Sequence, residues 1–224
     1  MSNIENVIAQ ELGISPKQVA AVVALVDEGN TIPFIARYRK EATGGLDDAT
    51  LRDLDERLTY LRTLEARKAD VLRTIDEQGK LTDALRAKIE EATVMQRVED
   101  LYKPYKKKRA TRASKARDAG LEPLALLMIS QATTNGDPRA LAAGYAKPGS
   151  AYDTPETVLA GARDIVAEAL ADDAEHVAAL RAFTRRQGSL AAEATDPEER
   201  TVYDTYYGFA EPLTRIPNHR ILAI

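Results

Sequence analysis

The stretch DDATLRDLDERLTYLRTLEARKADVLRTIDEQ, residues 47–78, decides the fold class because it contains neither proline nor glycine. Its leucines recur three or four residues apart, at Leu51, Leu54, Leu58 and Leu61, and Leu72 and Ile75 resume the stripe. This spacing predicts one long amphipathic helix that ends at Gly79. Residues 65–70 are rich in charge and poor in leucine, so we expect this middle part to stand clear of the core.

Shorter helices are predicted on both sides of the long one. Ser2 with Glu5 has the pattern of a capping box, and Ser15 followed by Pro16 marks a second helix start. Similar signals predict helices at residues 82–89, 122–132, 138–146, 155–172, 174–187 and 196–207. Only residues 220–224 look extended, and their apolar run suggests an element cut short by truncation. We therefore expect an all-α, multihelical protein with one long helix and no sheet of its own.

Three parts are predicted along the chain. Residues 1–119 form an N-terminal helical region with the long helix and a basic segment. Residues 120–188 form a subdomain of four short helices, of which the last carries arginines, and this outline is typical of a helix-turn-helix. Residues 189–224 return to the helical region and are truncated.

Composition excludes several classes of protein. Cysteine is absent, which excludes disulfides, thiolate metal sites and cysteine nucleophiles and fits a reducing compartment. The N-terminus lacks the apolar core of a signal peptide, and no stretch approaches the roughly 20 apolar residues of a membrane span. We expect a cytoplasmic protein without a membrane partner.

Motifs for catalysis are missing from the sequence. The two histidines, His176 and His219, are far apart and have no ligand-like spacing. Residues 42–46 lack the spacing and the lysine of a phosphate loop, and there is no serine-nucleophile elbow. Adjacent carboxylates in a helix point to different sides. The sequence therefore predicts no metal, no cofactor and no enzymatic activity in this chain.

A basic segment remains as the candidate site. No acidic residue interrupts it, and it contains Lys103, Lys106, Lys107, Lys108, Arg109, Arg112, Lys115 and Arg117. Such cations neutralise phosphates, and the interleaved Tyr102 and Tyr105 offer rings that stack on unpaired bases. A second basic group lies further along the chain, at Arg181, Arg185 and Arg186.

Other interpretations of these residues stay open. A run of like charge is often a solvated face or a counterweight to an acidic neighbour. Tyr102 continues an apolar stripe from Val94 and Val98, which favours a place in the core, whereas Tyr105 fits either role.

Several motifs together resemble the N-terminal region of the Tex family of bacterial transcription accessory proteins. They are TIPFIARYRKEATGGL (31–46), EQGKLT (77–82), EDLYKPYK (99–106), GLEPLA (120–125), GARDI (161–165) and IPNHR (216–220). The resemblance implies a longer protein with an RNase H-like domain, helix-hairpin-helix modules and a C-terminal OB-fold that makes the main RNA contacts. The sequence departs from the family at Lys107 and Ala110, where a proline and a further arginine are usual.

Two functions are compatible with these features. The first is a non-catalytic scaffold that packs against the remainder of the same polypeptide and adds an accessory nucleic-acid-binding surface. The alternative is purely a protein–protein interaction scaffold for the transcription machinery. The sequence does not distinguish RNA from DNA as the ligand. Salt dependence separates the two functions, because phosphate contacts weaken steeply with salt and an apolar interface does not.

Overall fold

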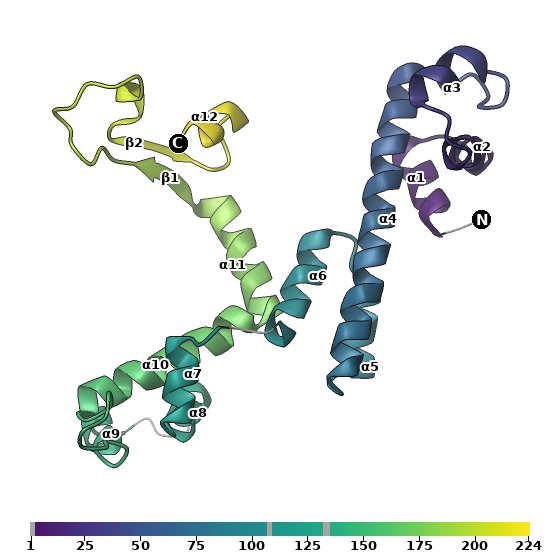
Figure 1. Ribbon diagram of the computed structural model, residues 1–224. Coiled ribbons are helices and arrows are strands. Elements are labelled where there is room, and N and C mark those ends of the chain that lie inside the picture. Colours follow the sequence, from purple (N-terminus) through teal and green to yellow (C-terminus); the bar gives the residue numbers. More distant parts are fainter. Residues whose placement is uncertain (1–2, 107–108, 132–134) are drawn as a thin grey trace. The chain divides into compact units, whose positions relative to one another are not determined.

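A computed structural model describes residues 3–106, 109–131 and 135–224 (Figure 1). The chain divides into two compact units, unit 1 up to Tyr102 and unit 2 from Lys103 onward. The described residues form twelve α-helices and two short strands, so the predicted all-α class is confirmed. The three-part division made from sequence, with its helix-turn-helix subdomain, stays a prediction.

Unit 1 is built around one long helix. It contains α1 (Asn3–Leu12), α2 (Pro16–Asp27), α3 (Ile32–Tyr38), α4 (Asp48–Glu77), α5 (Asp83–Glu90) and α6 (Met95–Tyr102). Helix α4 is the predicted long helix, and all five other helices of the unit pack against it. Its buried stripe comprises Leu51, Leu54, Leu58, Leu61, Leu64, Lys68, Val71 and Ile75. Burial of this stripe is the main stabilising contribution to the unit.

The middle of α4 is packed, contrary to the expectation from sequence. Leu64 is buried, and Lys68 exposes only 7% of its surface. The Lys68 ammonium donates hydrogen bonds to the Glu65 carboxylate (2.7 Å) and to the Glu90 carbonyl in α5 (2.8 Å). A lysine can occupy this position because its methylene chain covers apolar surface while its charge is paired. The stripe then continues through Val71 rather than Leu72.

Unit 2 begins with a compact group of helices on α10 (Pro155–Asp172), namely α7 (Arg112–Asp118), α8 (Glu122–Ser130) and α9 (Pro138–Ala143). A 3-10 turn, Lys103–Tyr105, precedes them. The core side chains are mostly small, at Ala113, Ala116, Leu121, Leu124, Ala125, Ala142, Val158, Ala162 and Ile165. Gly161 allows this close packing, because a Cβ there would lie 2.6 Å from the Tyr152 ring and 2.7 Å from Leu121.

Helix α11 (Ala174–Gln187) follows α10 after a single residue, Asp173. The Asp173 carboxylate accepts hydrogen bonds from the backbone N–H groups of Glu175 and His176, each at 2.9 Å. These bonds satisfy amide groups that have no partner within the helix. The bounds of α10 and α11 agree with the sequence prediction.

The last part of unit 2 corrects three expectations. Strands β1 (Ser189–Ala192) and β2 (Phe209–Pro212) pair antiparallel, with Ala192 opposite Phe209, so the chain does have a small sheet. The helix expected at residues 196–207 is absent apart from a 3-10 turn, Asp204–Tyr206. Residues expected to be extended belong instead to α12 (Asn218–Ala223).

Local hydrogen bonds hold parts of residues 196–207 in turns. The Asp196 carboxylate accepts from the N–H of Glu198 at 3.0 Å, and the Asp204 carboxylate accepts from the N–H of Thr201 at 2.6 Å. The Tyr207 hydroxyl donates to the Glu199 carbonyl at 2.8 Å. Such local bonds offer the backbone an alternative to helical hydrogen bonding.

The lengths and polarity of the helices bear on membrane insertion. Among the described residues, no helix is both long enough and apolar enough to cross a bilayer.

Candidate nucleic-acid interface

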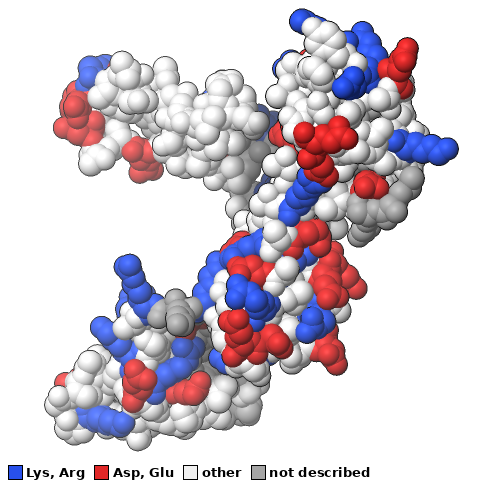
Figure 2. Space-filling view, turned by 45° about the vertical axis from the view of Figure 1, so that its right-hand side comes forward, with Lys and Arg blue, Asp and Glu red and all other residues white. Residues whose placement is uncertain are grey.

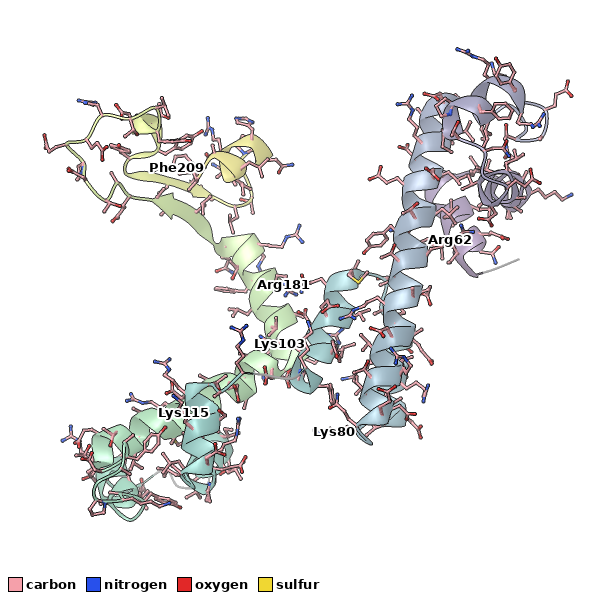
Figure 3. All side chains as sticks on the ribbon, in the orientation of Figure 1. Arg62, Lys80, Lys103, Lys115, Arg181 and Phe209 are labelled. Atoms are coloured by element: carbon pink, nitrogen blue, oxygen red, sulfur yellow. The ribbon has the colours of Figure 1, made fainter. Side chains whose placement is uncertain are left out.

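The predicted basic segment opens unit 2. Lys103 lies in the 3-10 turn, Lys106 and Arg109 lie in the connection that follows it, and α7 carries the remaining cations, Arg112, Lys115 and Arg117. Figure 3 labels Lys103 and Lys115 in this part of the chain. Lys107 and Lys108, which belong to the same prediction, lie outside the described residues.

Helix α7 fixes which cations face outward. Thr111 caps it, with its hydroxyl accepting from the N–H of Ser114 (3.0 Å) while the Ser114 hydroxyl accepts from the N–H of Thr111 (2.9 Å). Ala113 and Ala116 are buried in the core shared with α10, which leaves Arg112 and Lys115 on the exposed face. This helix was not predicted from the sequence because alanine is its only apolar residue type.

Three of the predicted cations are engaged with α10. The Lys103 ammonium donates to the Ala171 carbonyl (2.9 Å), where a positive charge is favourable at the end of a helix. The Arg117 guanidinium lies 2.5 Å from the Glu168 carboxylate, which is 16% exposed. Arg112 lies 3.3 Å from Asp164 but is itself 86% exposed. Through these contacts the three cations hold the 3-10 turn and α7 against α10.

Other cations of the segment point into solvent. Arg109 and Lys115 are exposed and make no side-chain hydrogen bond or ion pair with another described residue. Lys106 is exposed too, although it takes part in an interaction of its own. In Figure 2 basic side chains spread over the lobe formed by α7–α10, with acidic side chains among them. The segment therefore offers two uncompensated cations, and a third that is exposed, to an anionic ligand.

The second predicted group lies on α11. Arg185 and Arg186 occupy its last turn and are exposed, where their charge also favours the carbonyl end of the helix. Arg181, labelled in Figure 3, is half-buried and already has an interaction. The first basic group thus spans the 3-10 turn, the connection after it and α7, whereas the second lies on α11.

The two tyrosines beside the basic segment are both half-buried. Tyr102 ends unit 1, and the Arg67 guanidinium lies 5.2 Å above its ring. Val98 and Leu101 on the same helix are buried. Tyr102 is therefore largely used in the packing of unit 1, as the apolar stripe indicated. Tyr105 lies in the 3-10 turn of unit 2.

The histidines and carboxylates of the described residues do not converge. No group of three or more potential ligands comes together within the parts of the chain that the structure describes. His176 lies near the start of α11, with its Nδ1 3.2 Å from the Asp173 carboxylate, and His219 lies in α12.

A further basic group was not predicted from the sequence. Arg37, Arg39 and Lys40 lie at the end of α3 and surround the exposed Tyr38. The signal that could have found them is the same interleaving of cations with tyrosine that identified the Lys103–Arg117 segment.

Comparison with known families covers most of the chain. The profile of the Tex-like protein N-terminal domain matches residues 2–76, and that of the Tex central region-like domain matches residues 133–224. This chain belongs to the Tex family. The predicted basic segment lies between the two matched regions.

Relatives of this Tex chain are longer proteins. Protein tex of Bordetella pertussis is 48% identical over 219 residues, which cover 97% of this chain and 27% of that protein. The transcriptional accessory protein Tex of Neisseria gonorrhoeae is 44% identical over 224 residues, 99% of this chain and 29% of that protein. A human S1 RNA-binding domain-containing protein is 27% identical over 228 residues, 97% of this chain and 22% of that protein. The chain thus spans less than a third of the length of these relatives.

Proposed function

We propose that this chain is a non-catalytic, cytoplasmic helical region of a Tex-like transcription accessory protein. It acts first as a scaffold for the remainder of the polypeptide and second as an accessory nucleic-acid-binding surface. The observation that carries the second role is the exposure of Arg109 and Lys115, which have no carboxylate partner among the described residues. Exposed cations without a carboxylate partner can bind a phosphate backbone and release its counterions, because no ion pair has to be broken first.

The names of the relatives support the same role. One relative is named a transcriptional accessory protein, and a more distant one is named for an S1 RNA-binding domain. A region that packs within such a protein would lie close to nucleic acid even where another part makes the main contacts. A weak basic surface is sufficient in that position, because a linked second contact acts at high effective concentration.

The test is a titration of the 224-residue chain against single- and double-stranded DNA and RNA at two salt concentrations. The variant Lys106→Gln/Arg109→Gln/Lys115→Gln should weaken binding about equally for all sequences. The slope of log affinity against log salt should flatten by about 0.7 for each phosphate contact removed on single strands and about 0.9 on duplex. The control Arg139→Gln/Arg200→Gln/Arg215→Gln removes three exposed cations elsewhere in unit 2, of which Arg139 and Arg200 are paired with carboxylates.

Equal affinity and equal slope for the parent and the segment variant, with both folded, would contradict the proposed role of Lys106, Arg109 and Lys115. The purely protein-binding scaffold would then be favoured. One observation favours that alternative, since α8 buries only Leu124 and Ala125 while exposing Leu126, Leu127 and Ile129. Exposed apolar groups of this kind mark protein-interaction surfaces.

A further inference from the structure

The end of α3 and the loop after it carry a dense group of cations in unit 1. Arg37, Arg39 and Lys40 fall within four residues, and all three side chains are exposed. Together with Tyr38, Glu41 and Ala42 they line a shallow hollow of about 440 Å³, in which three cations outnumber one carboxylate. In Figure 2 basic side chains gather at the end of unit 1 that carries α3, with acidic side chains beside them.

The loop that follows these cations is firmly built. Thr43 is fully buried, and its hydroxyl donates to the Lys40 carbonyl (3.2 Å), which also accepts from the N–H of Gly45 (2.8 Å). Gly44 has a φ of +67°, and a Cβ there would lie 3.0 Å from the Gln18 amide, so a side chain at this position would be strained. The backbone of Lys40 is therefore held in place, and the cations are presented from a defined position.

Two aromatic rings lie among the cations. The rings of Phe34 and Tyr38 are 5.1 Å apart, and the Arg39 guanidinium lies 5.4 Å above the Phe34 ring. Tyr38 exposes 61% of its surface, more than any other aromatic residue of the described chain. Aromatic side chains usually stabilise a fold through the large area that they bury, and an exposed ring of this kind contributes little in that way. It is well suited to stack on a planar ligand.

The cations at this end of unit 1 differ from those along α4 because they are grouped and unpaired. Along α4 the arginines are neutralised, with Arg57 at 2.5 Å from Glu11, Arg62 at 2.7 Å from Asp27 and Arg67 at 2.7 Å from Glu99. In contrast, Arg37, Arg39 and Lys40 make no ion pair with a carboxylate among the described residues. The partial negative charge at the carbonyl end of α3 attracts these cations, but a helix of seven residues compensates only a small part of their charge.

We propose that Arg37, Tyr38, Arg39 and Lys40 form a second nucleic-acid site, which takes a single strand. The cations contact successive phosphates, and the Tyr38 ring stacks on one unpaired base. A duplex offers phosphates but no open base face, so it would use only the cations. An acidic peptide would likewise leave the exposed ring without a ligand. The site lies in unit 1, whereas the Lys103–Arg117 segment lies in unit 2.

The experiment uses the 224-residue chain carrying Lys106→Gln/Arg109→Gln/Lys115→Gln, so that binding by the basic segment of unit 2 is already weakened. The probes are fluorescent oligo-U and oligo-dT of about 12 nucleotides, a duplex of the same length and a poly-glutamate peptide. The two single strands distinguish RNA from DNA. Each probe is titrated at two salt concentrations.

Three variants are added to this background. Arg37→Gln/Arg39→Gln/Lys40→Gln removes the cations, and Arg37→Gln/Lys40→Gln keeps Arg39 on the Phe34 ring in case the triple variant unfolds. Tyr38→Leu removes the stacking face but keeps an apolar side chain. The matched control is Lys17→Gln/Lys80→Gln/Arg86→Gln, three exposed cations elsewhere in unit 1 that have no carboxylate partner among the described residues.

We expect the cation variants to flatten the salt slope on single strands by about 0.7 per phosphate contact removed, and the control to leave it nearly unchanged. Tyr38→Leu should weaken single-strand binding about 5- to 150-fold and leave duplex binding unchanged. The proposal fails if the cation variants behave like the control, or if Tyr38→Leu has no effect on single strands. Tighter binding of poly-glutamate than of either single strand would also overturn it.

Discussion

Helices α4 and α11 are both regular helices, but they are stabilised in different ways. Helix α4 buries eight side chains and packs against five other helices. Helix α11 has no buried side chain, exposes Leu180 and Phe183, and packs mainly against α10. An isolated helix of its length is marginal in water. Tertiary packing therefore stabilises α4, whereas α11 depends mainly on local capping and helix propensity.

The difference in packing between α4 and α11 can be tested by the same substitution, leucine to alanine, in each helix. Leu54→Ala in α4 removes a fully buried side chain and should lower the free energy of unfolding by about 2–5 kcal/mol. Leu180→Ala in α11 removes a side chain that is 65% exposed and should change it by less than about 0.5 kcal/mol. Urea unfolding followed by circular dichroism measures both. Equal losses would mean that α11 has a packing partner comparable to the core of unit 1.

A second comparison tests the caps, with an intermediate effect. Asp47 accepts from the N–H of Thr50 at the start of α4, and Asp173 accepts from two N–H groups at the start of α11. Either change to alanine should cost about 0.5–2 kcal/mol. Because buried leucines hold α4, the loss at Asp47 should appear only in global unfolding.

In α11 the same loss should appear locally. Asp173→Ala should speed amide hydrogen exchange in the first turns of α11 by about 2- to 30-fold, while exchange in α4 stays unchanged. Asp173→Asn, which keeps an accepting oxygen, is the control and should retain most of the protection. Unchanged exchange in Asp173→Ala would show that the cap does not determine the stability of this helix.

The smallest expected effect is the pH dependence of the ion pairs around α4. Hydrogen bonds from the Arg57 guanidinium, outweighing partial burial, lower the pKa of Glu11 below its ordinary value of 4.5. The folded pKa is below the unfolded one, so this pair stabilises unit 1 above pH 4.5, and the contribution disappears as the pH falls through the folded value. Because both groups are partly solvated, it amounts to less than about 1 kcal/mol.

Arg57→Gln should therefore lower the stability of unit 1 slightly at neutral pH and have a smaller effect in acid. Unfolding in urea at neutral pH and well below pH 4.5 makes the measurement. Glu11→Gln should show the same pattern, because it removes the other half of the pair. A loss that is equal at both pH values would assign it to the contact between Arg57 and the Tyr60 ring, whose centroid lies 5.0 Å away.

The sequence was most informative where helix start and stop signals coincide with apolar periodicity. Thr154 and Pro155 marked the start of α10, and Gly188 marked the end of α11, so both helices were predicted with their observed bounds. The leucine stripe of α4 was also clear. Its packed middle was not, because Lys68 looks polar in sequence although its methylene chain is buried.

Other features depended on interactions that sequence does not display. Arg117 lies 3.7 Å from the nearby Glu122, but its shorter contact is with Glu168, which lies 51 residues away and which no local pattern indicates. Strand β1 has the sequence SLAA, which is too short and too weakly patterned to predict. The group at Arg37 could have been found, since it has the same cation and tyrosine pattern as the basic segment.

The paired arginines along α4 have a consequence for how a nucleic acid would meet this protein. In Figure 2 acidic and basic side chains alternate over much of unit 1, and the chain as a whole carries a net charge of −4. Such a surface generates little long-range attraction for a polyanion, so most random collisions end in separation. Productive encounters are then confined to the few places where positive charge is uncompensated. If the chain binds nucleic acid as proposed, the ion pairs of the long helix would suppress background binding and leave the proposed sites without competition from the rest of the surface.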